Sequence, residues 1–192
     1  MTTVAVVRKG AIAVIAADTL IKWGNAKESA AYIANHDKIL SVGDSYLAVT
    51  GYATFKAILH DYFEQAGDEA QFDTPANIFR TWNRLHGALK ERYFLLPEED
   101  KEDALESSRI DCLIANPHGI FGVAAHRTVQ EFSKFYAYGS GSDYALGAMY
   151  SAYKDPALTA EQIAREAIEA AAEFDDGTGL PITSFSVRLL GS

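Results

Sequence analysis

Two apolar runs near the start of the chain, 3–7 and 11–17, constrain the fold more than any other feature. Only Arg8-Lys9-Gly10 separates them, and a Lys-Gly pair suits a tight hairpin turn. A connection this short cannot cross over a sheet, so the two strands must be antiparallel. An antiparallel sheet with one wet face alternates apolar and polar residues, and these runs do not. We therefore expect both faces to be covered, by a second sheet and by helices.

Later segments supply the elements for those layers. Further strands are expected at 38–42, 46–50, 110–115, 120–125 and 182–190, and helices at 55–65, 74–95, 143–153 and 159–174. Thr159 and Gln162 fit a capping box at the start of the last helix. This order predicts an α+β protein, a four-layer αββα sandwich of two antiparallel sheets with helices on both outer faces. At 192 residues, 48% of them apolar, the chain is expected to form one domain, 1–192.

Composition argues against several classes of function. The net charge is −9 and no basic stripe occurs, which argues against nucleic acid, because cationic contacts supply most of the non-specific affinity for phosphates. No apolar stretch approaches the roughly 20 residues that span a bilayer, and no charged leader precedes an apolar run. We expect a soluble, cytoplasmic protein with no membrane partner. The densest charge run, 98–103, is interpreted as a solvated loop.

The sequence predicts neither a metal nor a cofactor. Cys112 is the single cysteine, which excludes an intrachain disulfide and a cysteine-based metal site. The five histidines, at 36, 60, 86, 118 and 126, lack the spacing of metal ligands on one helical face. The segment 139–142, Gly-Ser-Gly-Ser, precedes a helix, but neither a Walker lysine nor dinucleotide spacing accompanies it. A phosphate site is therefore disfavoured.

The first candidate for chemistry is Thr2. Initiator methionine is generally removed when the next side chain is small, so Thr2 can become the first residue. Its α-amine, with a pKa of roughly 7.7–8.0, would then lie beside its own hydroxyl and can take the hydroxyl proton. Many cytoplasmic proteins begin Met-Thr, so Thr2 alone indicates little. Asp18 adds weight because the hairpin places the end of the second strand beside the start of the first, although it also fits a simple turn.

Five segments resemble, in order, those of proteasome β subunits and HslV-type peptidases, which are N-terminal nucleophile (Ntn) hydrolases. They are 2–7 with 15–18, then 38–39, 49–53, 139–142 and 175–179. Each is weak alone, but together they cover the chain from end to end at nearly the family's spacing. Within the family, the chain resembles the bacterial proteasome-homologue branch of the betaproteobacterial type. The resemblance implies the Ntn hydrolase fold and a threonine-type peptidase.

The resemblance also implies roles for residues at matching positions. Thr2 is the nucleophile, Asp18 resembles the carboxylate that pairs with the active-site lysine, and Lys38 resembles that lysine. A positive charge on Lys38 favours the attacking alkoxide. Gly51 resembles the glycine whose N–H forms the oxyanion hole, where a substrate carbonyl must approach the main chain closely. The separation of Asp18 and Lys38 exceeds the family's usual spacing, which puts an insertion at about 26–35.

Three further residues, Ser140, Asp175 and Thr178, resemble those that orient the terminal amine. Thr178 stands where the family has serine, so a hydroxyl is preserved. Asp176 competes with Asp175, since the pair can shift by one position. Structural interpretations also fit: a lysine at a strand edge for Lys38, a corner between strand and helix for Gly51, and a helix end before a glycine-rich loop for 175–179. The residue-selecting pocket is expected near Ile21, His36, Val49 and Ala53.

The function that the resemblance implies is an N-terminal threonine endopeptidase that forms an acyl-enzyme on Thr2. It would cut unfolded polypeptides inside a self-compartmentalising homo-oligomer of two stacked rings, each of six or seven subunits. The chain has no ATP site of its own, so any ATPase unfoldase is a separate partner. Two alternatives stay open: a small-molecule amidase of the same fold, and a catalytically inactive ring-forming scaffold. Retention of Met1 would leave Thr2 without a free amine and favour the scaffold.

Overall fold

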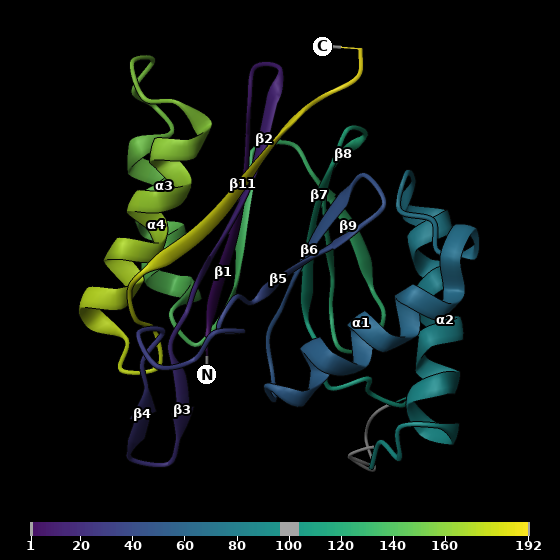
Figure 1. The fold of residues 1–192 in the computed structure, drawn as a ribbon. Helices are drawn as coiled ribbons and strands as arrows, with labels where there is room; N and C mark the ends of the chain where they lie inside the picture. Colours follow the sequence, from purple (N-terminus) through teal and green to yellow (C-terminus); the bar gives the residue numbers. More distant parts are fainter. Residues whose placement is uncertain (1, 97–103, 192) are drawn as a thin grey trace.

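The computed structural model describes residues 2–96 and 104–191 (Figure 1), so the acidic run 98–103 lies outside the described residues. Strands β1 (Thr3–Lys9) and β2 (Ile12–Asp18) form an antiparallel hairpin, as the sequence predicts. Gly10 makes the turn with a φ of 59°. The hairpin occupies the centre of a four-stranded antiparallel sheet, with β10 (Phe135–Gly139) beside β1 and β11 (Ile182–Arg188) beside β2.

A second antiparallel sheet has five strands in the order of the sequence. They are β5 (Ile39–Val42), β6 (Ser45–Val49), β7 (Cys112–Asn116), β8 (Gly119–Val123) and β9 (Val129–Phe132). A separate short hairpin, β3 (Ile21–Trp23) and β4 (Ala26–Glu28), follows the first sheet's β2. Helices α1 (Thr54–Ala66) and α2 (Pro75–Glu91), with a 3-10 turn η1 (Gly67–Glu69) between them, connect β6 to β7; α3 (Ser142–Ala152) and α4 (Ala160–Phe174) connect β10 to β11.

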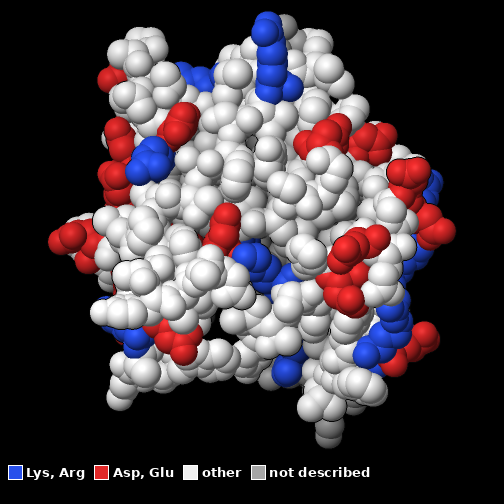
Figure 2. Space-filling view, in the orientation of Figure 1, with Lys and Arg blue, Asp and Glu red and all other residues white. Residues whose placement is uncertain are grey.

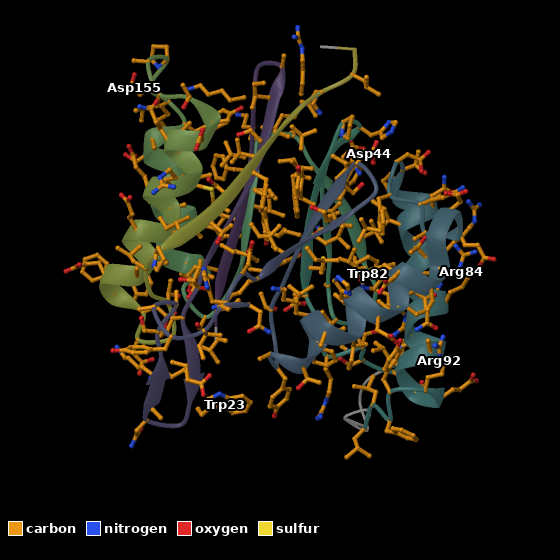
Figure 3. All side chains as sticks on the ribbon, viewed as in Figure 1. Trp23, Asp44, Trp82, Arg84, Arg92 and Asp155 are labelled. Carbon is orange, nitrogen blue, oxygen red and sulfur yellow. The ribbon has the colours of Figure 1, made fainter. Side chains whose placement is uncertain are left out.

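Packing on both faces explains why β1 and β2 show no alternation. One face of their sheet packs against α3 and α4 through Ala5, Val7, Val14 and Ala16. The opposite face packs against the second sheet through Val4, Val6, Ala13, Ile15 and Ala17. The far side of the second sheet is covered by α1 and α2 (Figure 1), and Trp82 points from α2 into that core (Figure 3). Burial on both sides removes any need for polar residues in the central strands.

The expected helices and strands are all present, with ends shifted by a few residues. Helix α2 ends at Glu91, short of the expected residue 95. The capping box of α4 forms: Gln162 N donates to Thr159 Oγ1 at 3.2 Å, and Thr159 N donates to Gln162 Oε1 at 2.8 Å. Sequence reasoning missed four strands: β3 and β4, which form the short hairpin, β9 at the edge of the second sheet, and β10 at the edge of the first. Of the helices in the described residues, none combines the length and the apolarity that crossing a membrane requires.

Gly139 ends β10 where the chain passes closest to the start of β1. Its φ is +105°, a conformation that favours glycine. A Cβ added there would lie 2.0 Å from the carbonyl oxygen of Thr2. The next residue, Ser140, donates its N–H to that same oxygen at 2.9 Å. A side chain at position 139 would therefore push the start of β1 away from β10.

We expect Gly139→Ala to lower the free energy of unfolding by at least about 2 kcal/mol, because strained φ values and the clash add. This corresponds to a fall in Tm of about 4–8 °C in a chain of this size. Gly147→Ala is the matched control: Gly147 lies in α3 with nothing within 4 Å of an added Cβ, so alanine should stabilise the helix by about 0.5–1 kcal/mol. Thermal unfolding of the unmodified protein and of both variants measures these changes. A Gly139→Ala variant as stable as Gly147→Ala would contradict the proposed close approach.

Candidate active site

The carboxylate of Asp18, at the end of β2, is the centre of the site. Its side chain is fully buried. Its two oxygens accept five hydrogen bonds: Oδ1 from Thr2 Oγ1 at 2.9 Å, Thr3 N at 3.0 Å and Lys38 Nζ at 2.7 Å, and Oδ2 from Leu20 N and Gly179 N at 3.1 Å each. A buried charge is tolerated when it is paired and hydrogen-bonded in this way. Asp18 is therefore a fixed acceptor and not a group exposed to solvent.

Lys38 approaches Asp18 from the second sheet, because it immediately precedes β5. Its side chain is only 13% exposed and forms an ion pair with Asp18. Burial lowers the pKa of Lys38 from its ordinary 10.5, and the charge and hydrogen bond of Asp18, with a weaker effect of Asp175, oppose that shift. The β3–β4 hairpin and the turns after it occupy the chain between the two residues, where the sequence analysis expects an insertion. The longer connection still brings the ammonium to the carboxylate.

Thr2 is held at both of its polar ends. Its hydroxyl donates to Asp18, and its carbonyl oxygen accepts from Ser140 N at 2.9 Å and from Ser140 Oγ at 3.4 Å. Thr2 is 4% exposed, and its remaining surface faces a cavity. The Thr2 hydroxyl and the Lys38 ammonium both donate to one acceptor, Asp18 Oδ1. The two groups therefore belong to one hydrogen-bonded cluster.

A second cluster of hydroxyls lies behind Thr2. Asp175 Oδ2 accepts from Ser140 Oγ at 2.7 Å and from Thr178 Oγ1 at 2.6 Å. The hydroxyls of Thr178 and Thr3 lie 2.6 Å apart, and Thr3 Oγ1 accepts from Gly141 N at 3.1 Å. Sequence reasoning did not identify Thr3. Its only signal is a hydroxyl at the start of an otherwise apolar strand.

The structure distinguishes the two adjacent aspartates. Asp175 makes the contacts with the hydroxyl cluster, whereas Asp176 forms an ion pair with Lys22 of β3 and is 74% exposed. The hydrogen bond from Lys22 lowers the pKa of Asp176. Asp175, and not the alternative Asp176, is therefore the aspartate that contacts the hydroxyl cluster. The Lys22–Asp176 pair connects the β3–β4 hairpin to the loop after α4.

A cavity of about 920 Å³ opens in front of Thr2. Lys38 and Gly51 line it, and so do the residues expected to select the substrate side chain, Ile21, His36, Val49 and Ala53. Residues of β3 form one wall, including Trp23, which projects from the hairpin at the lower edge of the molecule (Figure 3), and residues of α1 form the opposite wall. Figure 2 shows a hollow on this face, between the regions of the hairpin and of α1.

No metal site is seen in the part of the chain that the structure describes, and no basic surface for nucleic acid is seen on the face in Figure 2. Within residues 2–96 and 104–191, no group of three or more His, Cys, Asp or Glu side chains is placed to hold a metal ion. Basic side chains on the face in Figure 2 are scattered among acidic ones and form no continuous stripe. What the arrangement offers is a hydroxyl beside a buried ion pair, facing a cavity that a glycine backbone also lines. These are the parts needed for nucleophilic attack on a carbonyl group.

Solved structures include two at high identity to this chain. BPH from Thiobacillus denitrificans is 64% identical, with a TM-score of 0.95 and 100% of both chains covered. The same protein in complex with epoxomicin is also 64% identical, with a TM-score of 0.92, covering 98% of this chain and 99% of the other. Eukaryotic HslV from Trypanosoma brucei is 19% identical over 97% of this chain and 99% of its own, with a TM-score of 0.71, which shows a shared fold.

No protein-family model and no curated protein matches the chain. The structural relatives are sufficient, because identity of 64% extends over the whole of both chains. This protein belongs to the proteasome and HslV-type family of ring-forming threonine endopeptidases, on the branch of the bacterial proteasome homologues.

Proposed function

We propose that Thr2, freed by removal of Met1, is the nucleophile of this endopeptidase. The observation that carries the proposal is the contact series from Thr2 Oγ1 to Asp18 Oδ1 to Lys38 Nζ at the base of the cavity, with distances of 2.9 and 2.7 Å. The T. denitrificans relative binds epoxomicin, a proteasome inhibitor, which supports a competent nucleophile on this branch.

The reaction transfers an acyl group to the threonine. The free α-amine of Thr2 takes the proton of Oγ1, directly or through one water, and Oγ1 attacks the carbonyl carbon of the scissile peptide. The Lys38 ammonium stabilises the alkoxide, and Gly51 N–H donates to the oxygen of the tetrahedral intermediate. The C–N bond then breaks, the proton passes to the leaving amine, and an ester joins Thr2 to the acyl fragment. Water hydrolyses the ester and restores the hydroxyl.

The cluster behind Thr2 acts as the orienting part of the site. Asp175 accepts from Ser140 and Thr178, which fixes both hydroxyls, and Ser140 in turn contacts the Thr2 carbonyl. We assign Ser140, Asp175 and Thr178 to holding the amine of Thr2 toward its own hydroxyl. Thr3 belongs to the same set, because its hydroxyl lies within hydrogen-bond distance of Thr178. No metal or cofactor takes part in this scheme.

The substrate is unfolded polypeptide bound in an extended conformation along the cavity. Ile21, Val49 and Ala53 make the part of the lining that receives the side chain before the cleaved bond mainly apolar, and His36 adds a polar edge. A modest apolar side chain therefore fits this pocket best. An enclosed chamber, which admits only unfolded chains, favours polypeptides over small amides as substrates.

The assembly that we propose is two stacked rings of six or seven identical subunits, each subunit one αββα domain of the Ntn hydrolase type, located in the cytoplasm. Closed cyclic symmetry is the usual arrangement of such homo-oligomers. Large apolar side chains remain exposed on the single chain, among them Trp23, Tyr150 and the ring pair of Tyr144 and Phe174. Neighbouring subunits would cover such surfaces. An ATPase unfoldase, if one delivers substrate, is a separate protein.

Substitution of Thr2 tests the nucleophile. We expect Thr2→Ala to lower kcat for peptide hydrolysis by about 10³-fold or more, because the attacking oxygen is lost. Thr2→Ser keeps the oxygen and should stay within about tenfold of the unmodified protein. Alanine and serine are both small, so Met1 is removed equally in each. Native mass spectrometry confirms that each variant assembles alike, and full activity in Thr2→Ala would refute the assignment.

The pH dependence of hydrolysis tests the charge on Lys38. Burial lowers its pKa from 10.5, so the ammonium is lost as pH rises through a value below 10.5, and kcat/KM should fall over that same range. At pH values below that range, Lys38→Met should lower kcat by about 100-fold or more, because a preorganised charge at the alkoxide is missing. A profile in which activity persists up to pH 10.5, or a Lys38→Met variant with full activity, would contradict the role.

A further inference from the structure

A serine, a histidine and a glutamate lie in contact beneath α2, away from Thr2. Ser108 Oγ is 2.9 Å from His86 Nδ1, and His86 Nε2 is 3.1 Å from Glu106 Oε2. A catalytic triad of a hydrolase uses the same three kinds of group in the same order. Ser108, however, has no exposed surface and His86 is only 9% exposed. No substrate carbonyl can reach this serine, so the cluster is not a second nucleophilic site.

The proton positions in the cluster follow from the chemistry of its members. Hydrogen bonds from Lys90 and then from His86 lower the pKa of Glu106, so this group is a carboxylate and accepts only. His86 Nε2 therefore donates to Glu106, and its Nδ1 forms a hydrogen bond with the Ser108 hydroxyl. Every polar atom of the imidazole is used, which fixes the ring in one orientation between α2 and the segment that follows residue 103.

Arg127 ties a third part of the chain to the same cluster. Its Nε donates to Asn83 Oδ1 of α2 at 3.0 Å, and one terminal nitrogen donates to the Glu106 carbonyl at 2.7 Å and to Ser108 Oγ at 3.4 Å. Arg127 is 8% exposed. A buried guanidinium that donates in several fixed directions holds each acceptor in place. The segment 106–108 is thus anchored on two sides, by α2 and by the turn at Arg127.

This anchored segment continues directly to a turn that packs against Gly51. Arg109 adopts a φ of 56°, which is uncommon for a residue with a side chain. Its carbonyl oxygen would lie 3.1 Å from a Cβ at Gly51, so the two residues are close neighbours, and both line the cavity in front of Thr2. Two residues later, the Asp111 carbonyl accepts the N–H of Thr50 at 2.9 Å. The segment therefore contacts Thr50 and Gly51, the two residues that follow β6.

A left-handed conformation at Arg109 persists only when its surroundings impose it, and such residues gather at functional sites. Here the surroundings are the hydrogen bonds of the preceding residues: Arg109 N donates to Ser107 Oγ at 3.0 Å, and Ser108 N donates to the Ala125 carbonyl at 2.7 Å. Without the bond between Ser108 and His86, one of the constraints on this turn disappears. The turn would then relax, and its contact with Gly51 would shift.

We propose that His86, acting with Ser108 and Arg127, is a positioning residue that holds Gly51 in place through the turn at Arg109. The proposal rests on the proposed role of Gly51 as an oxyanion donor. That donor is needed in the transition state more than in the bound ground state, so its displacement lowers kcat and leaves KM nearly unchanged. His86 touches neither substrate nor nucleophile and acts only through the backbone of 106–111.

The test compares His86→Leu with Thr81→Ala, a control in the same helix. Thr81 is 1% exposed, and its hydroxyl contacts Gln71 N and O at 3.1 and 3.2 Å, remote from the turn at Arg109. Both variants lose buried hydrogen bonds of α2. We expect His86→Leu to lower kcat by about tenfold, a fraction of the effect of losing an oxyanion donor outright, with KM changed less than about twofold. Thr81→Ala should keep both constants.

Hydrogen exchange at the Thr50 amide, followed by mass spectrometry, gives a second readout that needs no activity. Its exchange should be faster in His86→Leu than in the unmodified protein, and unchanged in Thr81→Ala. If His86→Leu does not fold, Ser108→Ala, which deletes one hydroxyl, should show the same two effects at a smaller size.

Loss of kcat in Thr81→Ala equal to that in the test variant, or slow Thr50 exchange in the test variant, overturns the proposal. If the unmodified protein shows no Thr2-dependent hydrolysis, the proposed function is refuted instead. Exchange at the Thr50 amide alone would then test whether His86 holds the turn at Arg109.

Discussion

The buried carboxylate of Asp18 is the interaction on which the site depends. It joins the start of the chain, the backbone at Leu20 just beyond β2, the lysine before β5 and the loop before β11, because each donates to one of its two oxygens. A carboxylate without these donors would be expensive to bury, and a lysine without the carboxylate equally so. The ion pair and the backbone donors therefore stabilise one another, and removing any of them leaves charge unsatisfied. Thr2, the proposed nucleophile, is positioned as part of the same arrangement.

Strand register delivers the parts to this carboxylate. Val4 pairs with Ala17 in the central hairpin, so Asp18 lies level with the chain before Val4, and Ile182 of β11 pairs with Asp18 itself. The second sheet packs across the hairpin and brings Lys38 to its edge, and the end of β6 brings Gly51. Gly139 also passes close to the Thr2 carbonyl, and this contact helps to hold Thr2 in position. Residues from both sheets thus meet at one end of the sheet-to-sheet interface, where a cavity opens.

Sequence reasoning predicted what local pattern determines and missed what topology alone determines. The short connection at Gly10 and the unalternating runs fix the central hairpin and its burial, and Thr159 with Gln162 marks a helix start. Strands β9 and β10, at the edges of different sheets, were missed because most of their residues are only partly buried or exposed and follow no clear period. Strands β3 and β4 were missed because they are three residues each. Three contacts gave no signal in the sequence, because each joins residues that become neighbours only in the folded chain. They are the contacts of Thr3 with Thr178, of Gly179 N–H with Asp18, and of His86 with Ser108.

Every step of the proposed mechanism requires that the working protein begin with a threonine whose amine and hydroxyl act together beside the Lys38 ammonium. Tandem mass spectrometry of the N-terminal peptide from assembled, peptide-hydrolysing protein tests it most directly. The predicted result is a peptide that starts at Thr2 with an unmodified α-amine. Full hydrolytic activity in an assembly whose chains all retain Met1 would contradict it, since the proton acceptor of the proposed first step would not exist.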